Sequence, residues 1–154
     1  MLVSVESNLE VAEIPEIGET EEEKALSARE LRNLNFAWAL KHLRGKSFIN
    51  QSINEAITVS RDGLGEWKTV TKSRDQAASI KILGKLLECA IFWKAESPKS
   101  RDPNIEKIIY FRQECRVNGN RYIAVITVKV YKSPQNYHKY YHHYLDDFVL
   151  EPEK

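Results

Sequence analysis

The fold is decided by residues 108–130, which read IIYFRQECRVNGNRYIAVITVKV. Two runs rich in β-branched and aromatic residues flank Asn118-Gly119, a dipeptide that favours a two-residue hairpin turn. A turn there pairs residue 117 with 120 and residue 115 with 122. Because side chains alternate across a strand, this pairing separates an apolar face from a polar one, and a slip of one residue would exchange them.

The two faces of this predicted hairpin differ in chemistry. The apolar face carries Ile109, Phe111, Cys115, Val117, Tyr122, Ala124, Ile126, Val128 and Val130. The other face carries Tyr110, Arg112, Glu114, Arg116, Arg121, Thr127, Lys129 and Tyr131, with Ile108, Ile123 and Val125 between them. We expect the first face to pack against helices and the second to form an open, basic and aromatic surface.

Helix and strand signals surround the hairpin. Ser27-Ala-Arg-Glu30 and Ser73-Arg-Asp-Gln76 are capping boxes that predict helices over 28–43 and from 73 to about 94. Residues 46–60 are predicted to be extended, residues 61–65 to form a turn, and residues 137–144 to form a further strand after a turn at 133–136. The predicted fold is therefore α+β, with two helices packed on one face of a roughly four-stranded antiparallel sheet.

Charge divides the chain into an acidic arm and a basic body. Residues 1–23 contain eight Glu and no Lys or Arg, which leaves 23 basic and 14 acidic residues in the rest of the chain. We expect a flexible acidic arm (1–23), an N-terminal helix (24–44) and an α+β domain (45–150). The arm either remains a solvated tail or folds back and screens the basic face, an attraction that salt would weaken.

The remaining composition favours a cytoplasmic protein without a cofactor. No apolar run approaches the length of a membrane span, and the first residues lack the pattern of a signal peptide. The two cysteines, Cys89 and Cys115, form no CxxC pair and are interpreted as small apolar residues rather than a disulfide. Neither a phosphate-binding glycine loop nor a nucleophile elbow is present.

The segment 137–144 holds most of the candidate chemistry. Three histidines, His138, His142 and His143, allow a metal site, but the strand-like sequence and the lack of an acidic cluster disfavour it. Strand alternation instead places Tyr137, Lys139, Tyr141 and His143 on one face. If this is the Arg112 and Lys129 face, phosphate-binding cations, a proton carrier and stacking rings meet there.

Three bland interpretations stay open beside this hypothesis. A Tyr- and His-rich strand is often an ordinary half-buried strand, and a basic sheet face is often only solvated. Ser60-Arg61 precedes a glycine-rich stretch whose backbone N–H groups could hold phosphate, but such a stretch is more often a turn.

Several short motifs resemble a known family. They are GKSFIN (45–50), ITVSR (57–61), RVNG (116–119), YIAVITVK (122–129) and YYHHYL (140–145). Over about residues 45–150 the chain resembles the large polyvalent protein-associated domains of mobile elements, which in turn resemble the barnase/EndoU/colicin/RelE-like nuclease superfamily. The resemblance implies helices on a four-stranded antiparallel sheet and metal-independent RNA cleavage on the open sheet face.

The resemblance also implies which residues act. Its motifs fall on Ser60 and Arg61, on Lys129, and on Tyr141 and His143, although His142 stands where an Asp is expected. The leading hypothesis is an endoribonuclease-like toxin or phage effector that uses His143, Arg112, Lys129 and Tyr141 for catalysis. Its substrate-binding residues would be Ser60, Arg61, Tyr110, Thr127 and Lys139.

Partners follow from this hypothesis and from its rival. RNA is the expected partner, with an immunity or antitoxin protein as a second, and neither a metal nor a membrane is expected. The rival is a non-catalytic module that binds nucleic acid or inhibits a host defence enzyme, because Tyr, Trp and Arg are also enriched at protein interfaces. The ribonuclease hypothesis requires Arg112, Lys129 and His143 to share one face of the sheet.

Overall fold

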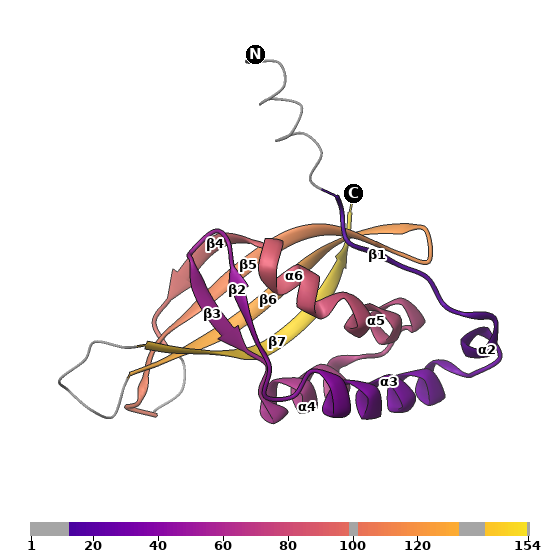
Figure 1. Ribbon diagram of the computed structural model, residues 1–154, viewed down its shortest axis with the longest axis horizontal. Helices are drawn as coiled ribbons and strands as arrows, with labels where there is room; N and C mark the ends of the chain where they lie inside the picture. The colour runs from indigo at the N-terminus through magenta and orange to yellow at the C-terminus, as the bar shows by residue number, and fades with distance from the viewer. Residues whose placement is uncertain (1–12, 99–101, 133–140, 154) are drawn as a thin grey trace, which may run out of the picture.

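The structure is a computed structural model that describes residues 13–98, 102–132 and 141–153. Its elements in chain order are β1 (Glu16–Ile17), α2 (Glu21–Lys24), α3 (Ala28–His42), β2 (Ser47–Asn50), β3 (Glu55–Thr58), α4 (Arg61–Val70), α5 (Arg74–Ser79), the 3₁₀ helix η1 (Ile80–Ile82), α6 (Leu83–Cys89), β4 (Ile91–Glu96), β5 (Ile105–Val117), β6 (Asn120–Lys132) and β7 (Tyr141–Pro152). Figure 1 shows the helices gathered on one side of a curled sheet.

The sheet corrects the predicted fold. The chain is α+β, but its sheet has seven strands in the order β1-β5-β6-β7-β3-β2, with β4 also paired to β5. It is mixed, because β1 pairs with β5 and β3 pairs with β7 in parallel. The prediction of two helices on a roughly four-stranded antiparallel sheet is therefore wrong. The prediction missed β1 and β4, of two and six residues, and it took β2 and β3, of four residues each, as one extended segment at 46–60. Such short strands give no clear alternating pattern.

The central hairpin is confirmed in its register. Val117 pairs with Asn120 and Cys115 with Tyr122, as the turn at Asn118-Gly119 predicted. Both turn residues have positive φ, 52° and 80°, which a hairpin turn of this kind requires. The predicted apolar face is buried except for the partly exposed Tyr122. It forms the core together with α3, α4, η1 and α6.

The helical layer differs from the prediction at two places. Helix α3 begins at its predicted capping box, where Ser27 and Glu30 each accept the other's backbone N–H. The second predicted helix is instead split into α5, η1 and α6, and the chain has already entered β4 at residue 91. The predicted turn at 61–65 is the first half of α4, which Ser60 caps by accepting the N–H of Gly63.

The edge of β7 pairs with β3 at residues 143–144 only. Beyond these residues, side chains from α4 and α5 provide hydrogen bonds to its backbone. The Ser60 hydroxyl donates to the Leu145 carbonyl at 2.9 Å. Further along, the Gln76 amide donates to the Phe148 carbonyl and accepts the Leu150 N–H, both at 2.7 Å. The Gln76 side chain therefore makes the two backbone hydrogen bonds that a neighbouring strand would make. For that reason it does not accept the Ser73 N–H, and the predicted second capping box has only the bond from the Gln76 N–H to Ser73.

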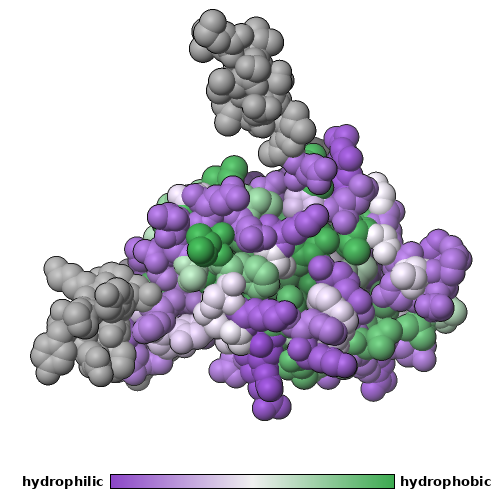
Figure 2. Space-filling model, in the orientation of Figure 1, coloured by the Kyte–Doolittle hydropathy of each residue, from purple (hydrophilic) through white to green (hydrophobic). Residues whose placement is uncertain are grey.

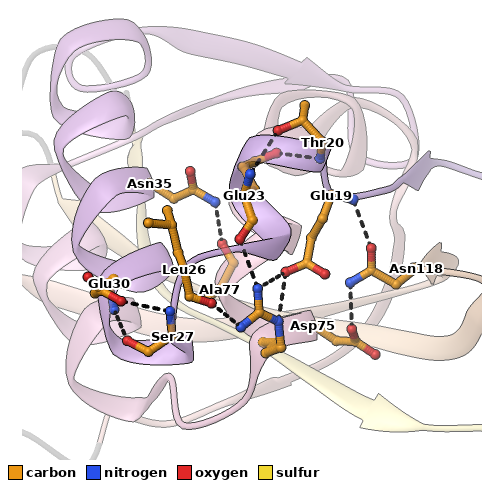
Figure 3. Close-up of polar contacts among 11 residues, drawn as sticks. Glu19, Thr20, Glu23, Leu26, Ser27, Glu30, Asn35, Asp75, Ala77 and Asn118 are labelled. Carbon is orange, nitrogen blue, oxygen red and sulfur yellow. Dashed lines mark hydrogen bonds and ion pairs between the residues drawn. The ribbon is translucent and has the colours of Figure 1, made fainter.

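The predicted flexible arm is partly ordered. Residues 1–12 lie outside the described residues, but β1 pairs with the end of β5 and α2 follows it. Figure 3 shows the polar contacts that hold this segment, among them the Glu19 N–H donated to Asn118 at 2.8 Å. The Arg74 guanidinium bonds the Glu19 carboxylate and the carbonyls of Glu23 and Leu26. The carboxylates of Glu19, Glu21 and Glu23 thus have structural partners, which charge alone did not predict.

Candidate functional site

The open face of the sheet, opposite the helices, was predicted to carry the site. It brings together the predicted residues Tyr110, Arg112, Thr127 and Lys129, since Tyr110 pairs directly with Thr127 and the other two share their alternation. Arg112 is exposed and the other three are partly exposed. The prediction that the two cations share a face is confirmed.

His143 does not lie on this face. It pairs with Val130, a buried core residue, and is itself only 9% exposed. The cause is an irregularity in the β6–β7 ladder, where Thr127 pairs with Asp147 but Val128 pairs with Leu145. The extra residue, Asp146, reverses the alternation of everything before it in β7. The geometric condition for His143 catalysis with Arg112 and Lys129 is therefore not met.

The same shift brings His142 to the open face. It pairs with Tyr131, is exposed, and lies with its ring centroid 6.4 Å from that of Tyr144. Because His142 and His143 lie on opposite faces, they cannot join in one metal site, and His138 and Lys139 lie outside the described residues. The backbone of Tyr141 pairs with Lys132 at the start of β7. Among the described residues, no cluster of three His, Cys, Asp or Glu is arranged to hold a metal ion.

An aromatic and cationic group lies where β4 meets β5, and we call it the Trp93 group: Trp93, Lys94, Tyr110 and Arg112. A bulge at residue 93 turns the indole onto the open face, where it meets the Tyr110 ring edge-on at 6.3 Å. The Arg112 guanidinium lies 4.6 Å from the indole centroid, and the Lys94 ammonium lies 4.5 Å from it. Trp93 is 46% exposed, although both cations lie against its ring.

The environment of the Trp93 group is apolar on one side and charged on the other. Ile91 and Phe92 precede the indole and are 63% and 41% exposed, although Phe92 turns toward Phe111 on the opposite face. The Tyr110 hydroxyl donates to Glu96, which also pairs with Lys94 at 3.1 Å. Burial and the Glu96 carboxylate raise the pKa of Tyr110, so the phenol stays protonated and donates at neutral pH.

A second polar group surrounds Lys129 in a surface pocket of about 250 Å³. Its lining residues are Ser60, Asp62, Lys129, Tyr131, Tyr144, Leu145 and Asp146. The Lys129 ammonium pairs with Asp146 at 3.0 Å, and this hydrogen bond raises the pKa of Lys129. Lys129 is therefore a fixed cation whose charge is already largely neutralised, unsuited to accept a proton.

The stretch at Ser60-Arg61, for which a turn was favoured over a phosphate cradle, is the start of α4. The Ser60 hydroxyl both caps α4 and donates to Leu145, so its hydrogen-bonding capacity is used within the fold. Arg61 is exposed at the first position of α4. Ser60 is also one of the residues that line the Lys129 pocket.

Sequence reasoning missed Trp93 and Lys94 because it placed them at the end of a helix. The run Ile91-Phe-Trp93 was a usable signal, since three large apolar residues in sequence cannot all face the core from one side of a helix. Its position directly after Ala90, which ends α6, assigns it to a strand instead.

Comparison with known proteins gives one family. The model of large polyvalent protein-associated domain 3 matches residues 27–144. No curated protein matches the chain, and no solved structure matches it. None of the helices in the described part of the chain has the length and apolar character needed to cross a bilayer.

Proposed function

Since the chain belongs to the large polyvalent protein-associated domain 3 family, a domain associated with mobile elements, we propose that it is a non-catalytic module that binds single-stranded RNA on its open sheet face. The observation that carries this proposal is the Trp93 group, a half-exposed indole with a guanidinium and an ammonium against it. Single-stranded RNA is bound by stacking unpaired bases on aromatic rings, while cations contact the adjacent phosphates.

The charge distribution supports stacking as the main source of affinity. Two lysines of the open face, Lys94 and Lys129, are already paired with Glu96 and Asp146. A ligand that depended on these charges would have to displace a carboxylate, whereas a base can stack on Trp93 by displacing the Arg112 guanidinium, which forms no ion pair among the described residues. We therefore expect a shallow dependence of RNA affinity on salt at this face.

The test uses two tryptophans that share a lysine contact but lie on opposite sides of the molecule. Trp93→Ala should weaken binding of a fluorescein-labelled 12-nucleotide single-stranded RNA by about 5- to 150-fold, the loss expected for one stacked base. Trp38→Ala is the matched control, because Lys81 lies 4.5 Å from the Trp38 ring, as Lys94 does from Trp93. Fluorescence anisotropy in EDTA measures both, and equal losses, or no binding by the wild type, would refute the proposal.

RNA cleavage is a second candidate function, favoured by the position of His142 beside Tyr131 and Tyr144 at the Lys129 pocket. In this version His142, and not His143, would carry protons in a metal-independent reaction. The RNA of the binding assay is examined on a denaturing gel after incubation. Intact RNA supports the binding module, whereas cleavage that His142→Ala abolishes would replace it with the nuclease.

A further inference from the structure

A stretch of positive charge that contains no acidic residue lies on the helical layer. Residues 31–54, which include most of α3, contain Arg32, Lys41, Arg44 and Lys46 and no Asp or Glu. The last three are exposed. Figure 2 shows hydrophilic side chains projecting from the lower margin of the molecule, below α4 and the C-terminal end of α3.

Neighbouring elements add a lysine to each flank of α3. Lys68 of α4 lies 4.7 Å from the ring of Phe36, and Lys81 of η1 lies 4.5 Å from the ring of Trp38. Residues two positions apart in an α-helix are separated by roughly 200° around its axis. The rings of Phe36 and Trp38, and the lysines that contact them, therefore lie on opposite flanks of α3. The α3 surface is defined here by five cations: Lys41, Arg44, Lys46, Lys68 and Lys81.

Ion pairing differs between the α3 surface and three lysines of the sheet. Among the described residues, none of the five forms an ion pair. On the sheet, by contrast, Lys94, Lys129 and Lys132 each pair with a carboxylate at 3.0–3.5 Å. An exposed positive surface of this kind attracts a polyanion without first breaking internal ion pairs.

We propose that the α3 surface binds the backbone of double-stranded nucleic acid. An α-helix is about 10–12 Å across with its side chains, and the major groove of DNA is about 12 Å wide. Cations on both flanks of α3 therefore meet the phosphates of the two strands that border the groove, whereas a single strand offers no groove to receive the helix. Recognition is through charge and groove shape, so it is independent of base sequence.

The test measures binding of a 20-base-pair labelled DNA duplex as a function of salt. Two double variants remove two cations each: Lys41→Gln with Lys46→Gln at the exposed positions, and Lys68→Gln with Lys81→Gln on the flanks. Each should reduce affinity about tenfold or more at 0.1 M salt and lower the slope of log affinity against log salt by about 1.8. Lys129→Gln with Lys132→Gln is the matched control and should leave the slope unchanged. Circular dichroism shows that each variant folds.

The outcomes separate this inference from the proposed RNA site. The α3 surface is supported if the α3 variants weaken duplex binding and Trp93→Ala does not. This holds whether or not single-stranded RNA binds the sheet. Unchanged duplex affinity in both α3 variants, or an equal loss in the sheet control, overturns it. Vesicles of phosphatidylcholine and 30% phosphatidylserine form a further arm, and binding to them in preference to the duplex would assign the surface to a membrane instead.

Discussion

Gly63 shows how close packing at a single residue shapes this site. It lies within α4 where an added Cβ would be 2.2 Å from the Leu145 carbonyl oxygen, a distance no side chain can adopt. This approach lets Ser60 reach the same carbonyl and holds α4 against β7 beside the Lys129 pocket. In the sequence Gly63 and Gly65 are equivalent and predict a turn. The need for a glycine at 63 comes from a strand about 80 residues away, so it could not be predicted locally.

Substitution of the two glycines should give opposite results. Gly63→Ala should destabilise the fold by about 2–3 kcal/mol, because either helix or strand must shift. Gly65→Ala, which has no atom within 4 Å of its added Cβ, should stabilise it by about 0.5–1 kcal/mol through helix propensity. Urea denaturation of both proteins measures the difference. Equal destabilisation by the two substitutions would contradict the close approach.

Asp147 gives a prediction about pH. Burial raises the pKa of Asp147, and the nearby carboxylates of Glu66 and Asp146 raise it further, against the opposing hydrogen bond from the Phe148 N–H. Because the folded-state pKa lies above the unfolded-state pKa, stability is lost as pH rises from the unfolded-state to the folded-state pKa, and the cost is absent in acid where the group is protonated in both states. Asp147→Asn keeps an oxygen acceptor for Phe148 but removes the charge.

We therefore expect Asp147→Asn to raise the Tm at pH 7 and to have little effect at pH 3. Differential scanning calorimetry at both pH values is the measurement, with the exposed Asp62→Asn as a control. A Tm that falls at pH 7, or a gain of equal size at both pH values, would contradict the sign worked out here.

At the scale of elements, β7 decides which residues can act together. The extra residue Asp146 in its ladder with β6 turns His143 to the core and His142 to the surface. The register of the β5–β6 hairpin was predictable because Asn118-Gly119 defines it. No turn signal of this strength precedes β7. The sequence pattern of Tyr and His also does not show that an extra residue at 146 interrupts the pairing with β6. The hairpin faces were thus predicted correctly and the closing strand was not.

The edge of β7 depends on Gln76, whose amide meets Phe148 and Leu150. Gln76→Leu fills a similar volume but leaves a strand carbonyl and an N–H without partners in a buried place. We expect a loss of about 2–4 kcal/mol in the free energy of unfolding. The exposed Gln51→Leu should change it by less than about 0.5 kcal/mol. Hydrogen exchange at the Leu150 amide gives a local check, and retained protection in Gln76→Leu would contradict this role.

At the scale of the whole molecule, the two proposed binding faces belong to different layers, the sheet and the helices. The sequence predicted a basic body correctly as a sum of charges, but charge patterning does not say which cations are paired. Folding brings Asp146 to Lys129 and Glu96 to Lys94 on the sheet, and it leaves the cations around α3 without such partners. Cations without an ion pair among the described residues thus lie on the helices and also on the sheet, at Arg112, Arg116 and Arg121, and the aromatic group lies on the sheet around Trp93.

The three tryptophans of the chain report on these places separately. Trp93 lies on the open sheet face, Trp38 on the helical layer, and Trp67 is fully buried in the core. Each indole N–H gives its own resonance in a ¹⁵N-correlation NMR spectrum. On titration with a 12-nucleotide single-stranded RNA, the account predicts that the Trp93 indole resonance shifts while those of Trp38 and Trp67 stay in place. A shift of the Trp38 resonance with that of Trp93 unmoved would contradict the assignment of RNA binding to the sheet.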